Sequence, residues 1–527
     1  MGSSSSWITS LFLFLLSTIS WVTSFSIDEN FFQCLQNYSQ NSIPISHAFY
    51  SPQNSSYSAI LQSSIQNLRF LSSTTPKPQF IITPFNESHV QAAVICSRQH
   101  GFQIRVRSGG HDYEGLSYVS DVPFIIVDMF NLRSVDVNVD NQTAWVQSGA
   151  TIGEFYYRIA EKSRNLGFPA SVCHTVGVGG LFSGGGHGFL TRKYGLASDN
   201  IIDARIIDVN GRILNRESMG EDLFWAIRGA GAAGFGIILS WKIKLVPVPD
   251  IVTVFNVNKT IEEGASKLVY QWQYIADKLY EDLFIRIFIS TDNANRTINA
   301  EFQSMYLGGV DKLLQLMEQS FPELGLQQKD CIQMSGIESV IYFSHLPNDE
   351  GLEVLLQRNQ PKTFYKIKSD YVKEPISEIV LEGIWERFQK VDIPVMTLTP
   401  FGGKMKEISE HETPYPHRVG NIYEIQYKVF SRTEDGATEK RINWIKELYS
   451  YMTPYVSKSP RAAYVNYRDL DLGTNKNGHT NHSEAEVWGH KYFKSNFERL
   501  VQVKTKVDPT NFFTHEQSIP PLSLFEK

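Results

Sequence analysis

Two glycine-rich runs decide the fold of this chain: Ser108-Gly109-Gly110-His111 and Val172-Cys173-His174-Thr175-Val176-Gly177-Val178-Gly179-Gly180. Each run carries a nucleophilic side chain, an imidazole in the first and a thiol in the second. Glycines have no side chain, so the backbone beside these nucleophiles can approach a bound ligand closely. A flavin ring is a group that both nucleophiles can attack covalently. The two runs are therefore candidates for a site at which a ligand of this kind is attached covalently.

Five further runs accompany these two: Thr75-Pro76-Lys77-Pro78, Phe182-Ser183-Gly184-Gly185-Gly186, Gly220-Glu221-Asp222-Leu223-Phe224-Trp225-Ala226-Ile227-Arg228-Gly229, Tyr464-Val465-Asn466-Tyr467-Arg468-Asp469 and Asp508-Pro509-Thr510-Asn511-Phe512-Phe513. Together, and in this order, the runs resemble those of the berberine bridge enzyme-like family of plant FAD-linked oxidases. The resemblance covers nearly the whole chain. It implies an α+β fold, with a two-part FAD-binding domain of the vanillyl-alcohol-oxidase (PCMH) type and an inserted substrate domain.

The pattern of strand-like and helical segments predicts where these parts lie. Strand and helix signals alternate up to Pro247 and Pro249, which punctuate the end of the first part. Beyond them, strand-like runs alternate with amphipathic stretches, which is typical of an antiparallel sheet backed by helices. The family runs return after about residue 462. We therefore expect a first FAD-binding part at 27–252, a substrate-binding domain at 253–461 and a C-terminal FAD-binding part at 462–527.

The N-terminus predicts passage through the secretory pathway. An apolar run extends from Trp7 to Trp21 and is followed by the small residues Ser24 and Ser26. It is shorter than the roughly 20 apolar residues that span a bilayer, and Ser and Thr interrupt it. We expect a signal peptide at 1–26, with no membrane attachment after cleavage. The sequons support a glycosylated protein in the apoplast or vacuole; they are Asn37, Asn54, Asn86, Asn141, Asn258, Asn295 and Asn481.

The charge distribution gives no sign of a nucleic-acid partner, and the cysteine count predicts a disulfide. The net charge is −6, with acids and bases interspersed, so no basic face indicates nucleic acid. We expect a monomer whose partners are a small-molecule substrate and dioxygen. Two of the four cysteines should form a bridge in an oxidising compartment. The resemblance implies that the bridge joins Cys34 to Cys96, which leaves Cys173 for the flavin.

The resemblance also implies how the cofactor is held. His111 would bond to the methyl carbon of the flavin ring and Cys173 to the neighbouring ring carbon. Because backbone N–H groups in glycine-rich turns can hold a pyrophosphate, the cofactor set also includes Arg107, Ser108, Gly109, Gly110, Gly177, Gly179, Gly180 and Asn466. The family usually has proline where this chain has His174. Val176 occupies a position that acts as a gate for dioxygen in the family, and valine there favours an oxidase. We expect no metal.

Two residues compete for the role of proton acceptor. His482 stands six residues before Trp488, where the family often has a tyrosine. An unperturbed imidazole titrates near ~6.5, whereas a tyrosine titrates near ~10, so His482 could serve as a base at neutral pH. Glu424 matches an acidic residue found in some family members. Strand alternation places Glu424 and Gln426 on one face, with Tyr423, Ile425 and Tyr427 on the other.

Four other residues complete the predicted site, Tyr113 and His187 as catalytic residues and Arg286 and Thr399 as substrate-binding residues. Tyr113 matches a frequent active-site tyrosine of the family, and His187 follows a glycine run that often continues into Tyr or Phe. Arg286 lies in an apolar strand, where a charge is costly unless it is paired. It either forms a salt bridge within the sheet or holds an oxygen of the substrate. We also assign Thr399 to the substrate site.

Three activities remain open at this level. The first is a secreted FAD-dependent oxidase of plant specialised metabolism, which takes hydride from a phenolic, prenylated or alkaloid-type substrate and gives hydrogen peroxide, with or without oxidative cyclisation. The second is a carbohydrate oxidase. The third is a redox-neutral, Diels–Alder-type cyclase in which the flavin serves as a structural wall, since such a reaction needs shape and a hydrogen-bond donor but no base.

Overall fold

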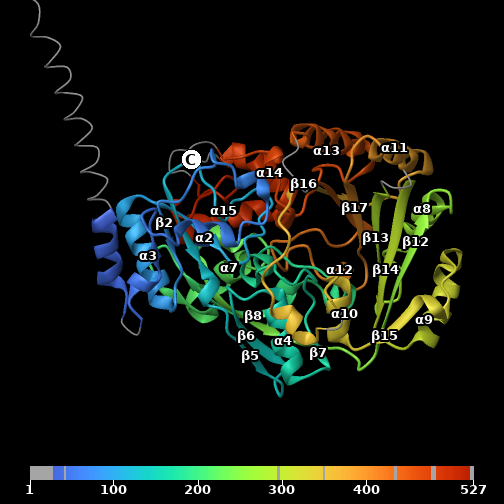
Figure 1. Cartoon of the computed structure of the whole chain (residues 1–527), viewed down its shortest axis with the longest axis horizontal. Helices are drawn as coiled ribbons and strands as arrows, with labels where there is room; N and C mark the ends of the chain where they lie inside the picture. Colours follow the sequence, from blue (N-terminus) through green and yellow to red (C-terminus); the bar gives the residue numbers. More distant parts are fainter. Residues whose placement is uncertain are drawn as a thin grey trace, which may run out of the picture.

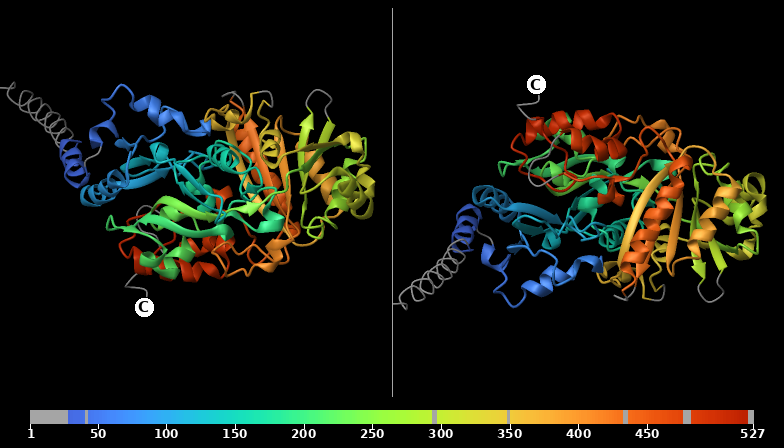
Figure 2. Two further views of the ribbon diagram at one scale, coloured as in Figure 1. Left: turned by 90° about the horizontal axis from the view of Figure 1, so that it is seen from below. Right: turned by 90° about the horizontal axis from the view of Figure 1, so that it is seen from above.

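The computed structural model describes residues 28–40, 43–292, 297–347, 350–431, 436–475 and 482–522. Three β-sheets of four, five and seven strands form the framework, and helices pack around them (Figures 1 and 2). Within the described residues, no helix has both the length and the apolar character needed to cross a membrane. The expected signal peptide at 1–26 and the sequons at Asn295 and Asn481 lie outside the described residues.

The four-stranded sheet carries the first glycine run. Its order is β1 (Phe49–Tyr50), β2 (Phe80–Ile82), β4 (Phe124–Asp128) and β3 (Gln103–Arg107), and the last three strands are parallel. Helix α3 (Glu87–His100) packs on β3 and β4. A disulfide joins Cys34 to Cys96 of α3, which confirms the predicted pair. The run that ends in His111 begins directly after β3.

The five-stranded antiparallel sheet carries the second glycine run. Its order is β5 (Val135–Asn138), β6 (Thr143–Gln147), β10 (Ile237–Lys244), β8 (Ile201–Ile207) and β9 (Ile213–Leu214). Helices α4 (Ile152–Lys162), α5 (Val178–Ser183) and α7 (Arg216–Ala226) pack on this sheet. A short pair, β7 (Leu166–Gly167) and β11 (Val246–Pro247), lies apart from it. Backbone hydrogen bonds from Ile152 and Gly153 to Val176 and His174 anchor the Cys173 loop at the start of α4.

The seven-stranded antiparallel sheet forms the opposite wall of the site. Its order is β15 (Cys331–Met334), β12 (Val252–Thr260), β14 (Thr297–Tyr306), β13 (Leu283–Asp292), β17 (Pro394–Pro400), β18 (Tyr423–Ser431) and β16 (Phe364–Val372). Helices α8 (Ala265–Trp272), α11 (Glu378–Phe388) and α13 (Thr438–Met452) share an apolar core with one face of the sheet (Figure 1). Helices α9 (Val310–Ser320) and α10 (Gly336–Phe343) flank its far end.

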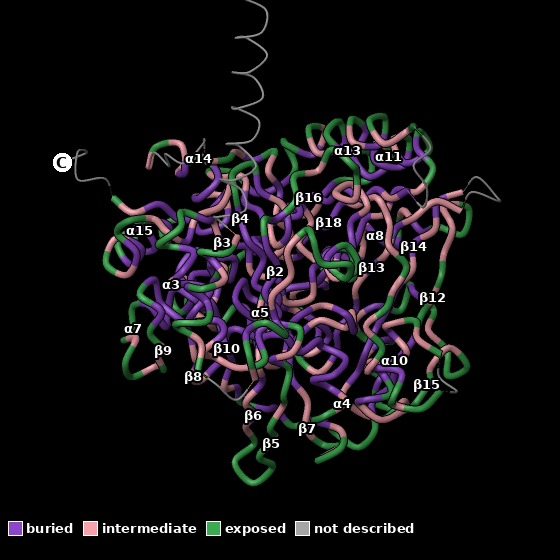
Figure 3. The backbone as a smooth tube through the Cα atoms, turned by 60° about the vertical axis from the view of Figure 1, so that its left-hand side comes forward, coloured by how far each residue is buried: buried purple, intermediate pink, exposed green. Residues whose placement is uncertain are grey.

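After this sheet the chain returns to the first part of the molecule. Helix α15 (Asn496–Val507) packs on α7 and on α14 (His482–Phe493), and these C-terminal helices, red in Figure 2, lie beside the green segments. The buried segments gather in the interior, where the three sheets meet (Figure 3). The predicted α+β fold, with a two-part FAD-binding portion and an inserted antiparallel sheet backed by helices, is confirmed. The residue boundaries of the three parts stay predictions.

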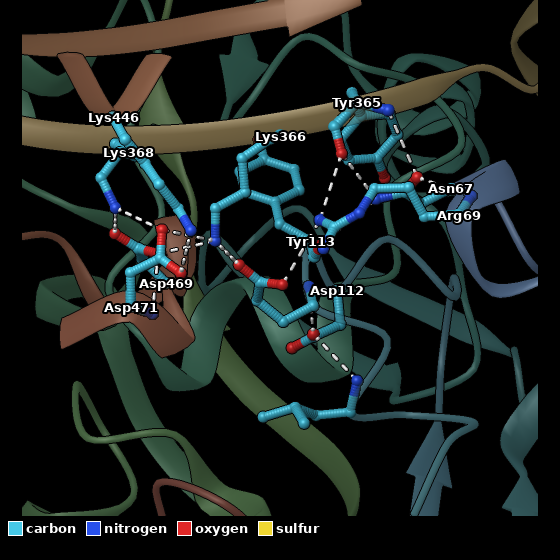
Figure 4. Close-up of polar contacts among 12 residues, drawn as sticks. Asn67, Arg69, Asp112, Tyr113, Tyr365, Lys366, Lys368, Lys446, Asp469 and Asp471 are labelled. Atoms are coloured by element: carbon cyan, nitrogen blue, oxygen red, sulfur yellow. Dashed lines mark hydrogen bonds and ion pairs between the residues drawn. The ribbon is translucent and has the colours of Figure 1, made fainter. Parts of the chain in front are cut away.

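Buried ion pairs fix the seven-stranded sheet to the rest of the molecule (Figure 4). Lys366 and Lys368 project from β16 toward the C-terminal segment. Lys366 Nζ lies 2.8 Å from Asp469 Oδ1 and also contacts Glu114, which follows the His111 loop. Lys368 Nζ lies 2.5 Å from the other Asp469 oxygen. Breaking such a buried pair costs about 3–5 kcal/mol, so this cluster holds the two walls of the site in register.

Candidate functional site

A cavity of about 590 Å³ lies between the glycine runs and the seven-stranded sheet. Strands β13, β17 and β18 form one wall, and the loops after β3 and before α5 form the other. The cavity brings together most of the residues that the sequence assigned to the cofactor: Ser108, Gly109, Gly110, His111, Cys173, Val176, Gly177, Gly179, Gly180 and Asn466.

The two glycine runs meet backbone to backbone. A Cβ on Gly109 would lie 2.3 Å from the backbone N of Gly177, and a Cβ on Gly177 would lie 2.0 Å from Ser108 Oγ. Gly110 has a φ of +71°, and a Cβ there would lie 1.7 Å from the carbonyl oxygen of Ser64. Only glycine fits these positions. The close approach holds the His111 and Cys173 loops side by side.

His111 and Cys173 meet at one hydroxyl group. His111 Nε2 lies 2.9 Å from Thr175 Oγ1, and Cys173 Sγ lies 3.9 Å from the same oxygen. Burial lowers the pKa of His111 to about 4, and the charge of His174 acts in the same direction. The imidazole is therefore neutral at physiological pH and keeps a nucleophilic lone pair. Burial raises the pKa of the Cys173 thiol, while hydrogen bonds from Thr175 oppose this rise.

The wall formed by the glycine runs fits an FAD group. At Gly180 a Cβ would meet only open space, so the backbone there borders the cavity directly. Arg105 also lines the cavity; its Nη2 donates to Glu516 Oε1 at 2.7 Å, while its buried Nε and Nη1 have no hydrogen-bond partner among the described residues. A buried cation of this kind suits an anionic group such as a pyrophosphate. His111, Cys173 and this wall are the residues that would hold FAD.

Arg107 requires a correction, because its side chain does not line the cavity. Its guanidinium is fully buried; Nε and Nη2 donate to Asp128 Oδ2 at 3.0 and 2.6 Å, and the remaining N–H groups donate to the carbonyls of Ile60 and Leu61. These partners accept hydrogen bonds from all three nitrogens of the group. Residues two apart on a strand share a face, so alternation alone could not separate Arg107 from Arg105.

On the opposite wall, β18 alternates as predicted. Gln426 and Lys428 line the cavity, and Glu424 contacts a lining residue, His187. Tyr423, Ile425 and Tyr427 belong to the apolar core on the other face of the sheet. The neighbouring strands contribute further lining residues, which are Thr397 and Thr399 from β17 and Phe284, Arg286 and Phe288 from β13. Thr399 pairs in register with Glu424.

Glu424 is a buried carboxylate in contact with His187. Its side chain is 1% exposed, and its Oε2 lies 3.0 Å from His187 Nε2. Burial raises the pKa of Glu424, whereas the neighbouring His187 opposes that rise. The N–H of Gly186 donates to the hydroxyl of Tyr464 at 2.7 Å, which fixes the backbone before His187. A carboxylate with a raised pKa in a cavity is a good proton acceptor near neutral pH.

Two tyrosines stand next to this pair. Gln426 Nε2 donates to the hydroxyl of Tyr113 at 3.1 Å, and Tyr113 stacks on Tyr467 with ring centroids 5.7 Å apart. The Tyr467 hydroxyl lies 3.3 Å from His187 Nε2. Tyr467, Lys428 and Thr175 line or border the site and were missed by sequence reasoning. Tyr467 lies inside the quoted family run, and Lys428 follows Gln426 in the alternation, so both signals were present.

Arg286 lines the cavity rather than forming a salt bridge. Its Nε donates to the neutral Gln303 at 2.9 Å, and its guanidinium lies 4.5 Å from the ring centroid of Phe189. Among the described residues no carboxylate forms an ion pair with it. Of the two interpretations of Arg286, this placement agrees with a role toward the substrate.

His482 requires a second correction, because it lies away from the cavity. It is the first residue of α14, where its Nδ1 lies 3.2 Å from Glu486 Oε1 and its Nε2 lies 3.4 Å from Glu498 Oε2. Its ring packs against Phe497 of α15. The i,i+4 spacing to Glu486 places both side chains on one helix face, and the packing of α14 on α15 turns that face away from β18.

Comparisons with known proteins identify the family of this chain. The family described as "FAD binding domain" matches residues 78–216, and "Berberine and berberine like" matches residues 463–520. Tetrahydroberberine oxidase of Berberis wilsoniae is 57% identical over 94% of each chain. Monolignol oxidoreductase AtBBE-like 13 of Arabidopsis thaliana is 50% identical, covering 99% of this chain and 98% of its own.

A solved structure extends the agreement to three dimensions. The BBE-like #28 protein of Arabidopsis thaliana aligns with a TM-score of 0.88 at 50% identity, covering 94% of this chain and all of its own. Sequence and fold thus agree with this relative along nearly the whole length. The chain belongs to the berberine bridge enzyme-like family of FAD-linked oxidoreductases.

Proposed function

We propose that this protein is a secreted oxidase of plant specialised metabolism that acts on an aromatic substrate of the phenolic or alkaloid type. The observation that carries the proposal is the Glu424 carboxylate, buried beside the cavity and 3.0 Å from His187. It belongs to β18, whose Gln426 and Lys428 line the cavity that His111 and Cys173 also line. A proton acceptor there is useful to an oxidation and has no task in a redox-neutral cyclisation.

The residues around the cavity divide the work. FAD held by His111, Cys173 and the glycine wall would supply the hydride acceptor and the route of the electrons to dioxygen, which gives hydrogen peroxide. Glu424 accepts the proton that the substrate loses from a hydroxyl or ammonium group as hydride leaves. His187 keeps the Glu424 carboxylate ionised and oriented. Gln426 and Tyr113 form a hydrogen-bonded pair that orients a polar substituent of the substrate.

Tethering at two points belongs to the same proposal. The neutral imidazole of His111 and the thiol of Cys173 share the Thr175 hydroxyl, which supports bonds from both to one ring. Val176 lines the cavity one residue after Thr175, and we assign it the role of the dioxygen gate. The disulfide between Cys34 and Cys96 is consistent with secretion.

The experiment tests cofactor and reaction together. Acid-denatured protein should stay yellow, and peptides containing His111 and Cys173 should carry or share the flavin mass. Release of all colour into the supernatant contradicts the tethering. Purified holoenzyme is then incubated with tetrahydroberberine, coniferyl alcohol and glucose, with and without dioxygen. We expect peroxide release with one of the first two, and flavin bleaching in the anaerobic sample. Product formation without bleaching assigns the protein to the cyclase class instead, and peroxide from glucose alone to the carbohydrate oxidases.

A further inference from the structure

Two cationic side chains face the cavity from neighbouring parts of the seven-stranded sheet. Arg286 projects from β13 and Lys428 from β18, and both line the cavity. Each lies against the same aromatic ring, with the Arg286 guanidinium 4.6 Å and the Lys428 Nζ 5.7 Å from the ring centroid of Phe288. Phe288 therefore brings the two positive charges into one region of the cavity wall.

Neither cation forms an ion pair with a carboxylate in the described part of the chain. Arg286 donates to the neutral Gln303. The nearest carboxylate on β18 is Glu424, and it faces His187. Two other lysines of the same sheet behave differently, since Lys366 and Lys368 of β16 each contact two or three carboxylates. Among the described residues, the sheet thus pairs its lysines with carboxylates at one edge and leaves two cations of the cavity wall without an ion pair.

Two like charges in a confined cavity repel each other, and each loses hydration there without a counterion. A group that supplies negative charge at this place removes both penalties. The anionic part of FAD has another location available, because Arg105 and the glycine wall lie on the opposite side of the cavity. The counterion is then expected from the substrate.

We propose that Arg286 and Lys428 form a subsite for a carboxylate carried by an aromatic substrate. Arg286 and Lys428 donate hydrogen bonds to the carboxylate, while the rings of Phe284, Phe288 and Phe343 contact the aromatic part. The inference rests on the proposed function, because it names the class of compound that the oxidase accepts as substrate. It adds a charge requirement that the general family assignment does not contain.

A matched pair of ligands tests the subsite. Ferulate and coniferyl alcohol have the same aromatic skeleton and differ in a carboxylate against an alcohol. Each is titrated into anaerobic holoenzyme, and the Kd is taken from the change in flavin absorbance on mixing. A hydrogen-bonded charge pair changes affinity by about 10- to 100-fold, so ferulate should bind that much more tightly than coniferyl alcohol. Equal affinities overturn the proposal.

Variants assign the effect to Lys428. Lys428→Met should weaken ferulate binding about 10-fold and leave coniferyl alcohol within about twofold, whereas Lys428→Arg should retain tight ferulate binding. Lys404→Met, an exposed lysine on α12 (Lys404–Glu407), is the control and should change neither Kd. Unchanged ferulate binding in Lys428→Met overturns the proposal. Loss of flavin from Lys428→Met, measured by absorbance per protein, also overturns it by assigning the charge to the cofactor.

The test of the carboxylate subsite can succeed or fail independently of the test of the oxidase activity. The titration reports binding whether or not the ligand is oxidised. Tight, Lys428-dependent binding of ferulate without flavin reduction by any compound supports the carboxylate subsite and contradicts the oxidase. Flavin reduction by coniferyl alcohol with no preference for ferulate supports the oxidase and contradicts the subsite.

Discussion

Two of the histidines in the described part of the chain, His187 and His482, contact glutamate at similar distances but in different surroundings. In the cavity, His187 Nε2 lies 3.0 Å from Glu424, whose side chain is 1% exposed. On the C-terminal helices, His482 lies 3.2 Å from Glu486 and 3.4 Å from Glu498, whose side chains are 41% and 50% exposed. Burial decides which pair can do chemistry. Water screens the charges of the second pair, whereas burial raises the pKa of Glu424, which suits the proposed role of proton acceptor.

The largest difference between the two histidine–glutamate pairs is expected when Glu424 is replaced. We expect Glu424→Gln, which keeps the shape and removes the charge, to slow flavin reduction by ~10²–10⁴, the usual effect of losing a general base. The measurement is anaerobic stopped-flow reduction with whichever compound reduces the wild-type flavin. Glu486→Gln is the matched control on α14 and should leave the rate unchanged. An equal loss in the control, or none in Glu424→Gln, contradicts the contrast between the pairs.

Replacement of His187 should change how the rate of flavin reduction depends on pH. Glu424 must be ionised to accept a proton, so the reduction rate should fall as pH drops through its raised pKa. His187 lowers that pKa, so His187→Phe should raise it further and move the acidic limb to higher pH. At a fixed neutral pH we expect a loss of roughly tenfold, about one pKa unit. The rate is recorded from pH 5 to 9. A limb that stays in place or moves to lower pH removes His187 from the role of partner.

The oxygen gate gives a further test of the buried site. We expect Val176→Leu to slow flavin reoxidation by about tenfold or more, because a bulkier side chain narrows access, and to leave reduction within about twofold. Double-mixing stopped-flow, with reduction followed by a pulse of dioxygen, separates the two half-reactions. Parallel slowing of both would indicate a general disturbance of the cavity and not a gate.

The exposed pair should produce the smallest effect. His482→Ala should lower the free energy of unfolding by about 0.2–1 kcal/mol, the range for exposed ion pairs, with flavin reduction unchanged. Urea unfolding in low and high salt measures the contribution, which should shrink in 1 M NaCl because salt screens exposed charges. A large loss of flavin reduction in this variant would return the base to His482 and make the two pairs functionally equivalent.

Local rules predicted much of the site. The glycines of both runs are required by the backbone itself, because a Cβ at Gly109 or Gly177 collides with the facing run. Alternation along 423–427 placed Glu424 and Gln426 on the cavity side, since a strand admits only two faces. The pairing of Cys34 with Cys96 came from the family resemblance, and the structure contains it.

By itself, the sequence determined the family, the order of its parts, and the two glycine runs that carry His111 and Cys173. These features depend on short runs whose backbone requirements hold in any surroundings. Only the tertiary structure decided which charged residues are neutralised. Arg107 faces Asp128, His482 faces Glu486 and Glu498, and Lys428 faces the cavity. The partners of a buried charge come from segments far apart in the chain, and their distance and burial exist only once the sheets and helices have packed.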